Sequence, residues 1–123
     1  MGLDDVVGLK DEVFSYLEDH RDEIVKYLQK LVGIDTQAPP GSNYDEICGF
    51  MADRFSSYRC DVGIHEAPEE YLKLSGADLL GLRGPRSNVV ARYRGRTGRP
   101  ALHVSAHIDT AAIQMDGWTV DPL

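Results

Sequence analysis

The sequence predicts an α/β fold, because segments with helical periodicity are followed by segments with the alternation typical of strands. Apolar residues recur at spacings of three and four within residues 3–33 and again within residues 44–58. Residues 60–66, 87–94 and 100–107 are short alternating or apolar runs near turn-forming residues. Two helices, a strand and then a strand pair are typical of a layered α/β arrangement.

The first predicted helix covers residues 3–33, and Asp19–Arg21 is where a break in it would fall. Lys30 in the last turn and Gly33 just beyond it are typical signals for a helix end. Charged residues fill the face opposite an apolar stripe. The stripe consists of Val13, Leu17, Ile24, Leu28, Leu31 and Val32.

A loop and a second helix come next. Residues 35–42 must form a loop, since they contain the run Pro-Pro-Gly. We predict a helix over residues 44–58, with Asn43 as its N-cap and Glu46 reaching back in a capping box. The side of this helix that faces the core would carry Ile47, Met51, Phe55 and Tyr58.

The rest of the chain is predicted to hold three strands. The first is Cys60–Glu66, followed by a long loop over Pro68–Arg86 with one helical turn. The second is Ser87–Arg94, which places Val89, Ala91 and Tyr93 on one face. Gly95–Arg99 supplies turn chemistry, so that Pro100–His107 would return beside the second strand as the third.

Composition and charge narrow the classes of function. The 123 residues suffice for one domain, and their net charge of −7 disfavours binding to a nucleic-acid backbone. No run approaches the length of about 18 apolar residues that spans a bilayer. The start of the chain lacks the order of a signal peptide, and Val6 stands where myristoylation needs serine or threonine. We therefore expect a cytoplasmic protein without nucleic-acid or membrane partners.

An arginine group and a pair of cysteines are candidate binding or metal sites, and each has a simple structural interpretation. The arginine group lies in the second half of the chain and consists of Arg83, Arg86, Arg92, Arg94, Arg96 and Arg99. Its leading interpretation is the solvated face of a hairpin, and the alternative is a surface for anionic substrates or a neighbouring domain. The cysteines Cys48 and Cys60 form no CxxC pair, so we expect them to be unreactive and partly buried rather than zinc ligands.

Three of the four histidines have simple structural interpretations. His20 lies on a charged helical stretch and is expected to face solvent. His65 opens His-Glu-Ala-Pro-Glu, which fails as a helical zinc motif because Pro68 would disrupt the helix and Glu69 replaces the second histidine. His103 is expected to be a packed strand residue.

The fourth histidine, His107, ends the predicted apolar strand and is followed two residues later by Asp109. In extended backbone, side chains at i and i+2 point to the same side, so both can face one cleft at the strand end. A neutral imidazole binds zinc through one nitrogen, and a carboxylate that accepts the other N–H fixes its tautomer. The spacing suits a metal ligand and its orienting partner, although His-x-Asp alone is a weak signal.

The context of His107 adds a more specific signal. Residues 101–110 read Ala-Leu-His-Val-Ser-Ala-His-Ile-Asp-Thr, and residues 117–123 read Gly-Trp-Thr-Val-Asp-Pro-Leu. Upstream are Leu-Val-Gly-Ile-Asp-Thr at 31–36, Pro-Pro-Gly at 39–41 and Arg-Ser-Asn-Val-Val-Ala at 86–91. Together, and in this order, these segments resemble the zinc-dependent amidohydrolases and exopeptidases. That family includes acetylornithine deacetylase, succinyl-diaminopimelate desuccinylase, aminoacylase and glutamate carboxypeptidase.

The resemblance implies a three-layer α/β/α catalytic domain of a zinc exopeptidase, with two or three helices and about three strands in this part. It implies that His107 is a ligand to one of two zinc ions, for which cobalt or manganese could substitute. Asp109 would belong to the catalytic site as the partner that orients His107. The substrate would be an N-acyl amino acid or small peptide whose amide bond is hydrolysed, and the full-length enzyme would be a homodimer.

The resemblance also implies that residues 1–123 are an incomplete, inactive fragment: the amino-terminal part of the catalytic domain. Family enzymes use further carboxylates, a glutamate base, a distal histidine and a dimerisation (lid) domain, which these residues do not supply. Catalytic zinc normally takes three protein ligands. Departures at Ala111, where the family often has Val-Pro nearby, and at Leu123, where it often has phenylalanine, touch no ligand and blur only the subgroup.

Two other functions remain open. One is a non-catalytic α/β interaction module derived from such an enzyme, which would bind a partner through an exposed strand edge and the arginine-rich hairpin. The other is a metal-binding protein that uses His107 with surface carboxylates.

Overall fold

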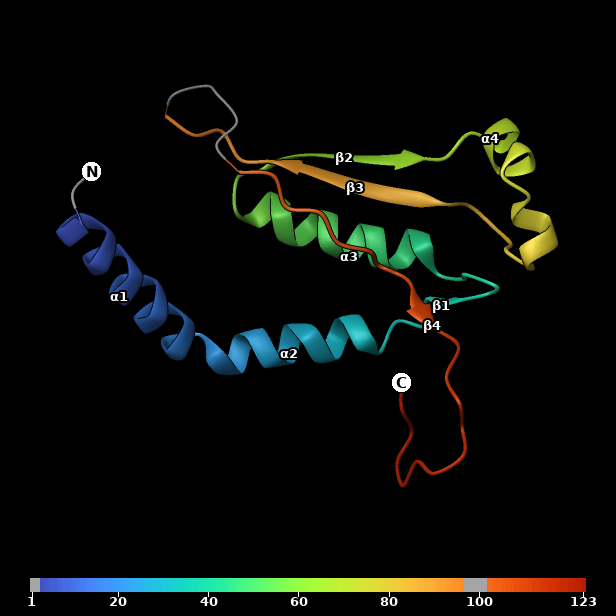
Figure 1. The fold of residues 1–123 in the computed structure, drawn as a ribbon, viewed down its shortest axis with the longest axis horizontal. Coiled ribbons are helices and arrows are strands. Elements are labelled where there is room, and N and C mark those ends of the chain that lie inside the picture. Colours follow the sequence, from blue (N-terminus) through green and yellow to red (C-terminus); the bar gives the residue numbers. More distant parts are fainter. Residues whose placement is uncertain (1–2, 97–101) are drawn as a thin grey trace. The chain divides into compact units, whose positions relative to one another are not determined.

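The computed structural model describes residues 3–96 and 102–123, and these residues contain helices together with short strand pairs (Figure 1). The general α/β prediction is therefore confirmed. The chain divides into two compact units, Met1–Gly33 and Ile34–Leu123. The first unit is helical, and the second contains all of the strands in the described residues.

The first unit consists of helix α1 (Leu3–Asp19) and helix α2 (Arg21–Val32), which meet at His20. The predicted break is confirmed at this residue. The prediction that His20 faces solvent is wrong in part, because its ring is half-buried and stacks on Tyr16 at 3.9 Å between centroids. Its Nδ1 also lies 2.8 Å from the Tyr16 carbonyl oxygen. The His20 ring is therefore held by two contacts with Tyr16. No residue of α2 is buried.

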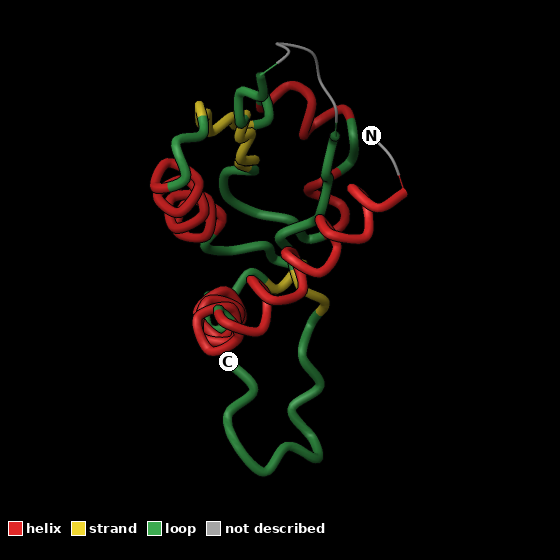
Figure 2. Tube along the Cα trace, turned by 90° about the vertical axis from the view of Figure 1, so that its left-hand side faces the viewer, coloured by secondary structure: helices red, strands yellow, loops and turns green. Residues whose placement is uncertain are grey.

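The centre of the second unit is the antiparallel pair of β2 (Asp61–Glu66) and β3 (Ser87–Arg92), which packs on α3 (Tyr44–Ser57). Figure 1 shows α3 running along this pair, and Figure 2 shows the helices and strands from the side. Alternation in β3 buries one side, since Ser87 is buried and Val89 and Ala91 are half-buried. Among the described residues of this unit, the buried apolar ones are Ile34, Ile47, Cys48 and Ala77.

The start of α3 departs from the predicted capping box. Asn43 does precede the helix, but its backbone is left-handed, with φ of 58°, and its side chain makes no capping hydrogen bond. An N-cap residue normally has extended backbone, which aims its side-chain oxygen at the first free N–H groups. Here the Asn43 amide instead donates to the carbonyl oxygen of Asp35 at 2.8 Å. The capping-box prediction is wrong, and Asn43 links the helix start to the preceding loop.

The apolar side of α3 is confirmed for three of its four predicted residues, all except Tyr58. Ile47 is 4% exposed, and Met51 and Phe55 are half-buried. Tyr58, by contrast, is 48% exposed and lies under the Arg54 guanidinium, 4.8 Å from the ring centroid. The helix ends one residue before it, so that Tyr58 no longer follows the helical period toward β2 and β3.

Cys48 is the most deeply buried side chain of α3. It is 0% exposed and makes no disulfide. Desolvation raises the pKa of its thiol, and the nearby negative charge of Asp45 adds to this effect. The thiolate is the reactive form of cysteine, so burial makes Cys48 unreactive, whereas Cys60 is only half-buried.

We predict that iodoacetamide alkylates Cys60 much faster than Cys48 in the native chain, and that both react at similar rates in urea. Mass spectrometry of the labelled peptides measures both rates. The folded chain holds the Cys48 proton more tightly than the unfolded chain. The free energy of unfolding should therefore fall as the pH rises past about 8.5, the ordinary thiol pKa. Equal native alkylation rates would contradict this account.

The segment between β2 and β3 holds more helix than predicted. Instead of one turn, it contains helix α4 (Glu69–Leu74) and the 3₁₀ helix η1 (Ala77–Leu80). An exposed ion pair from Lys73 to Glu69, 2.7 Å long and one turn apart, supports α4. Such exposed pairs add little stability, so the short helix depends on its tertiary surroundings.

The predicted return strand Pro100–His107 is absent from residues 102–107, the part of it that the structure describes. Its first two residues, like Thr97–Arg99 of the predicted turn, lie outside the described residues. Residues 102–109 are described and contain no strand. A strand requires a ladder of hydrogen bonds to a neighbour, and in the described residues β3 has such a ladder with β2 alone, on one of its two edges. The chain next pairs at β4 (Thr110–Ala111), which lies parallel to β1 (Gln37–Ala38).

Candidate metal-ligand site

The site predicted at His107 and Asp109 lies immediately before β4, rather than at the end of a long strand. Its backbone is held by the loop that precedes α3. The Thr36 hydroxyl donates to the Ile108 carbonyl oxygen at 2.9 Å, and the N–H of Thr110 donates to the Thr36 carbonyl oxygen at 3.2 Å. These bonds join residues more than 70 positions apart and fix the chain on both sides of Asp109.

Gln37 extends this attachment in the direction of the C-terminus. Its side-chain oxygen accepts a hydrogen bond from the N–H of Ile113 at 2.7 Å. Its side-chain nitrogen donates to the Asp35 carboxylate at 3.0 Å, and the same carboxylate oxygen accepts from the Gln37 backbone N–H at 3.1 Å. The loop at residues 35–37 thus anchors residues 108–113, which include β4.

The ring of His107, which precedes this anchored segment, lies against the backbone of Asp109. Nδ1 of His107 lies 2.7 Å from the backbone carbonyl oxygen of Asp109, and 3.8 Å from its carboxylate oxygen Oδ1. The group within hydrogen-bonding distance is therefore the carbonyl, whereas the sequence pointed to the carboxylate. The His107 side chain is 84% exposed, compared with 44% for that of Asp109.

This geometry determines which imidazole nitrogen can act as a ligand. A carbonyl oxygen only accepts hydrogen bonds, so Nδ1 of His107 must carry the proton when it bonds to Asp109. The lone pair of the neutral ring is then on Nε2. An exposed Nε2 with its partner nitrogen fixed by a hydrogen bond is the arrangement that metal-binding histidines use.

The described residues around the candidate site can supply one metal ligand, the imidazole of His107. Among residues 3–96 and 102–123, no group of three histidine, cysteine or carboxylate side chains is placed to hold an ion. Zinc sites in catalytic centres usually use three protein ligands and an open position. His107 can provide one of these ligands, and Asp109 fixes its orientation through the backbone.

The other histidines do not join this site. His103 is exposed and outside any strand, so its prediction as a packed strand residue is wrong, for the reason given for residues 102–109. His65 lies in β2 opposite Asn88 and is exposed. Because β2 is extended, His65 and Glu69 are not on one turn of a helix, which agrees with the rejection of that motif.

The arginine group divides into two kinds. The exposed members are Arg83, Arg92, Arg94 and Arg96, while Arg99 lies outside the described part of the chain. Arg86 is half-buried; its guanidinium donates to the Pro40 carbonyl oxygen at 2.8 Å and stacks on the Tyr44 ring at 4.7 Å. Its role is therefore to brace the loop before α3, which the solvated-hairpin interpretation did not include.

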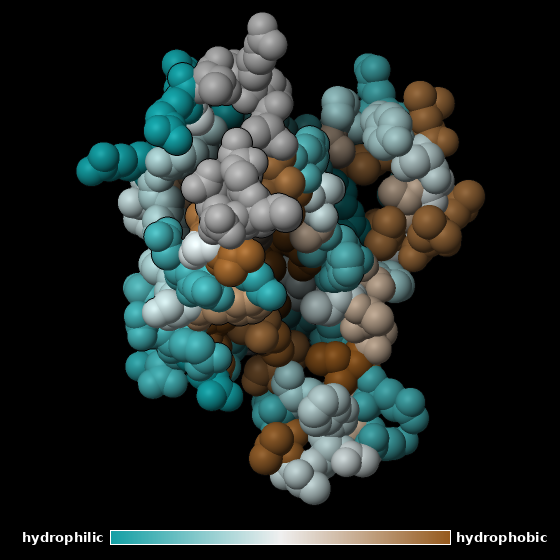
Figure 3. Space-filling view, turned by 60° about the vertical axis from the view of Figure 1, so that its left-hand side comes forward, coloured by the Kyte–Doolittle hydropathy of each residue, from teal (hydrophilic) through white to brown (hydrophobic). Residues whose placement is uncertain are grey.

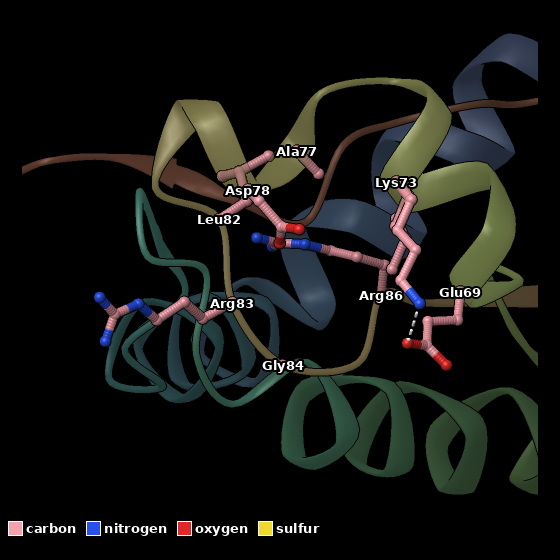
Figure 4. Close-up of a pocket in the computed structure, with 9 residues that line it drawn as sticks. Glu69, Lys73, Ala77, Asp78, Leu82, Arg83, Gly84 and Arg86 are labelled. Atoms are coloured by element: carbon pink, nitrogen blue, oxygen red, sulfur yellow. Dashed lines mark ion pairs between the residues drawn. The ribbon is translucent and has the colours of Figure 1, made fainter.

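A pocket of about 180 Å³ lies beside Arg86, within residues 69–86. Figure 4 shows Lys73 paired with Glu69 at its rim and Arg83 pointing away from the other labelled side chains. Lys73 and Arg86 are thus held by other groups, and Asp78 adds negative charge to the lining. The pocket does not include His107 or Asp109.

Apolar side chains are exposed in the segment that leads to His107 and in the segment that follows β4. Leu102 is 83% exposed and Val104 is 79% exposed, and Trp118 is 57% exposed with its indole N–H donating to the Gln114 carbonyl oxygen at 3.0 Å. Figure 3 shows apolar residues, in brown, between polar residues on one face of the molecule. Residues 102–109 therefore carry apolar side chains that the described residues do not bury.

Comparisons with known proteins assign no family. No protein-family model, no curated protein and no solved structure matches the chain. A search of the described residues for a helix long and apolar enough to cross a bilayer finds none. The support for a function of this site therefore comes from the motifs of the sequence and from the geometry around His107.

Sequence reasoning missed the contribution of Thr36 and Gln37. Thr36 is the last residue of the segment Leu-Val-Gly-Ile-Asp-Thr at 31–36, and Gln37 follows it, but the motif assigns no role to either side chain. The available signal is a run of polar residues, Asp35, Thr36 and Gln37, between a short apolar run and Pro-Pro-Gly. Polar residues at such a position are candidates for bonds to another segment, although the sequence does not say which one.

Proposed function

We propose that residues 1–123 form the amino-terminal part of the catalytic domain of a cytoplasmic zinc-dependent amidohydrolase or exopeptidase with a three-layer α/β/α fold. In this proposal, His107 is a ligand to one of two zinc ions, and Asp109 orients it. The observation that supports the proposal best is the hydrogen bond from Nδ1 of His107 to Asp109, which leaves the exposed Nε2 available for a metal.

The contribution of this chain to such an enzyme is to hold and orient one ligand. The hydrogen bond to the Asp109 carbonyl keeps the His107 ring in one orientation, so that little freedom is lost when Nε2 coordinates. When bound, a zinc pair lowers the pKa of a water molecule and polarises the amide carbonyl of an N-acyl amino acid or small peptide. Proton transfer requires a general base, and the proposal places this base and the other ligands in polypeptide beyond the described residues.

The proposal predicts that the purified 123-residue chain hydrolyses no N-acetyl amino acid, with or without added Zn²⁺. One histidine cannot assemble a site that needs several ligands from different segments. Release of acetate and of the free amino acid from a panel of N-acetyl amino acids measures this. Hydrolysis that a chelator abolishes and zinc restores would show that the chain carries a complete site, which contradicts the division of ligands proposed here.

The coding sequence after Leu123 provides an independent test. The family that the motifs resemble places Gly-x-Gly-x-x-Asp-x-Lys-Gly downstream, with an aspartate that bridges the two metal ions. Reading this sequence within a few dozen codons would support the enzyme. A stop codon directly after Leu123 in the genomic DNA would count against it and favour the second candidate.

That second candidate is a non-catalytic α/β module that binds a partner protein. It is favoured by the exposure of Leu102 and Val104 on an extended segment without a strand neighbour, because such a segment can add to the sheet edge of a partner. Replacing both residues by lysine would abolish partner binding in the module and leave zinc binding at His107 unchanged. The two candidates are therefore separable in one pair of variants.

A further inference from the structure

Thr36 is the most deeply buried polar residue described, with an exposed fraction of 1%. Both of its hydrogen-bonding oxygens are directed at the segment that carries the candidate site. The hydroxyl Oγ1 donates to the Ile108 carbonyl oxygen, and the Thr36 carbonyl oxygen accepts from the Thr110 N–H. The two bonds therefore hold the residues that flank Asp109, one on each side.

The direction of these bonds constrains Asp109. In extended backbone, the N–H and C=O of successive residues point to alternate sides of the chain. The Ile108 carbonyl and the Thr110 N–H both point toward Thr36. The carbonyl of Asp109, between them, then points to the opposite side. It is this carbonyl that lies 2.7 Å from Nδ1 of His107.

We propose that Thr36 is a positioning residue for His107: by holding Ile108 and Thr110, it turns the Asp109 carbonyl toward Nδ1 and so selects the imidazole tautomer whose Nε2 is free. The effect passes through the backbone, since Thr36 has no hydrogen bond with the imidazole. The meaning of this tautomer for metal binding rests on the proposed function, whereas the selection of the tautomer itself does not.

A purely structural role for Thr36 is the competing explanation. Burial of a hydroxyl with a good partner stabilises the fold by itself, and its removal leaves the Ile108 carbonyl unsatisfied. A change in stability therefore cannot separate the two roles. The protonated nitrogen of His107 can, when T36V is compared with a variant that loosens the same segment without removing the bonds that flank Asp109.

Gln37 provides a matched control. It also bonds the segment through its side chain, but to Ile113, four residues beyond Asp109. Replacing Gln37 by methionine removes this bond and keeps the volume of the side chain roughly constant. If the inference is correct, this variant loses stability while the tautomer of His107 does not change.

The experiment is a long-range ¹H–¹⁵N spectrum of the histidine rings in the metal-free 123-residue chain. It is recorded at about pH 8. The parent chain and the variants T36V, T36S and Q37M are compared. We expect the Nδ1–H tautomer to dominate for His107 in the parent chain, in T36S and in Q37M. In T36V, the ratio of Nδ1–H to Nε2–H should fall by up to about fivefold, the effect of one typical hydrogen bond on an equilibrium.

The inference is overturned if T36V keeps the parent ratio at His107, or if T36S, which retains a hydroxyl, loses it. A T36V variant that fails to fold does not prevent the test. In that case the parent chain decides, because finding mainly the Nε2–H tautomer of His107 there would overturn the inference without any variant.

Adding Zn²⁺ to the same samples separates this inference from the proposed function. A tautomer that depends on Thr36, combined with no zinc-induced change at Nε2 of His107, would support the positioning role and count against the metal site. A zinc-induced change at Nε2 of His107 in the parent chain, combined with a tautomer ratio that is the same in T36V as in the parent chain, would support the metal site and overturn the positioning role.

Discussion

Replacing His107 by alanine is expected to abolish the saturable binding of Zn²⁺ by the chain, which should be weak because one imidazole supplies the main ligand. The exposed Nε2 of His107 is the nitrogen that the hydrogen bond to Asp109 leaves free. Isothermal titration at about pH 8 with the parent chain and H107A measures the loss. Replacing His103, which is also exposed, by alanine is the matched control and should leave zinc binding unchanged.

The variant D109A tests the role of Asp109 in the same zinc titration. The backbone carbonyl of Asp109, not its carboxylate, is the group within hydrogen-bonding distance of His107, so D109A keeps the orienting contact. We expect D109A to weaken zinc binding by less than the 10-fold to 100-fold that is typical when an orienting partner is lost, that is, by less than about tenfold. Zinc binding that survives in H107A and is lost in H103A would refute the assignment of the ligand.

The second large effect is expected in the loop before α3, at Gly41. Its φ of +76° lies in the left-handed region, and a Cβ at this position would lie on the guanidinium of Arg86. That guanidinium bonds the Pro40 and Gly41 carbonyl oxygens and stacks on Tyr44, where α3 begins. G41A would therefore combine backbone strain of about 1–3 kcal/mol with the displacement of Arg86. Urea denaturation followed by circular dichroism measures the loss.

Gly84 is the matched control for this effect, since its φ of +75° is nearly the same and a Cβ there would meet nothing within 4 Å. G84A should show the strain alone. We expect G41A to be less stable than G84A by a further amount of about 1–2 kcal/mol, which corresponds to the lost hydrogen bonds of Arg86. Equal losses in the two variants would mean that Arg86 does not brace this loop.

Local signals in the sequence predicted the elements that depend on local interactions. The break at His20, the helix at Tyr44–Ser57 and the strands that include Asp61–Glu66 and Ser87–Arg92 all follow from periodicity and from turn-forming residues. Their bounds differ from the predicted ones by one or two residues, which is the usual uncertainty of helix and strand ends.

Pairing between distant segments could not be predicted in the same way. The sequence favoured a hairpin between residues 87–94 and 100–107 because a turn-rich stretch separates them. In the structure, β3 pairs with β2, which is more distant along the chain, and residues 102–109 form no strand. Alternation identifies a segment that can pair but not its neighbour, since the backbone groups of all strands are equivalent.

The candidate site shows the same limit on a smaller scale. His107 and Asp109 could be chosen from their spacing because residues two apart in extended backbone lie on one side. The bonds from Thr36 and Gln37 span more than 70 residues and involve side chains that have many other potential partners. The change from the carboxylate to the carbonyl of Asp109 depends on a backbone orientation that spacing alone does not contain.

The central claim is that His107 presents Nε2 to a metal while Asp109 holds Nδ1, and titration of the ¹⁵N-labelled chain with Zn²⁺ tests it most directly. We predict that the ring nitrogen whose signal moves is Nε2 of His107, with Nδ1 still protonated, while the ring signals of His20, His65 and His103 stay in place. A zinc-induced change at Nδ1 of His107, or an equal response from all four rings, would contradict it.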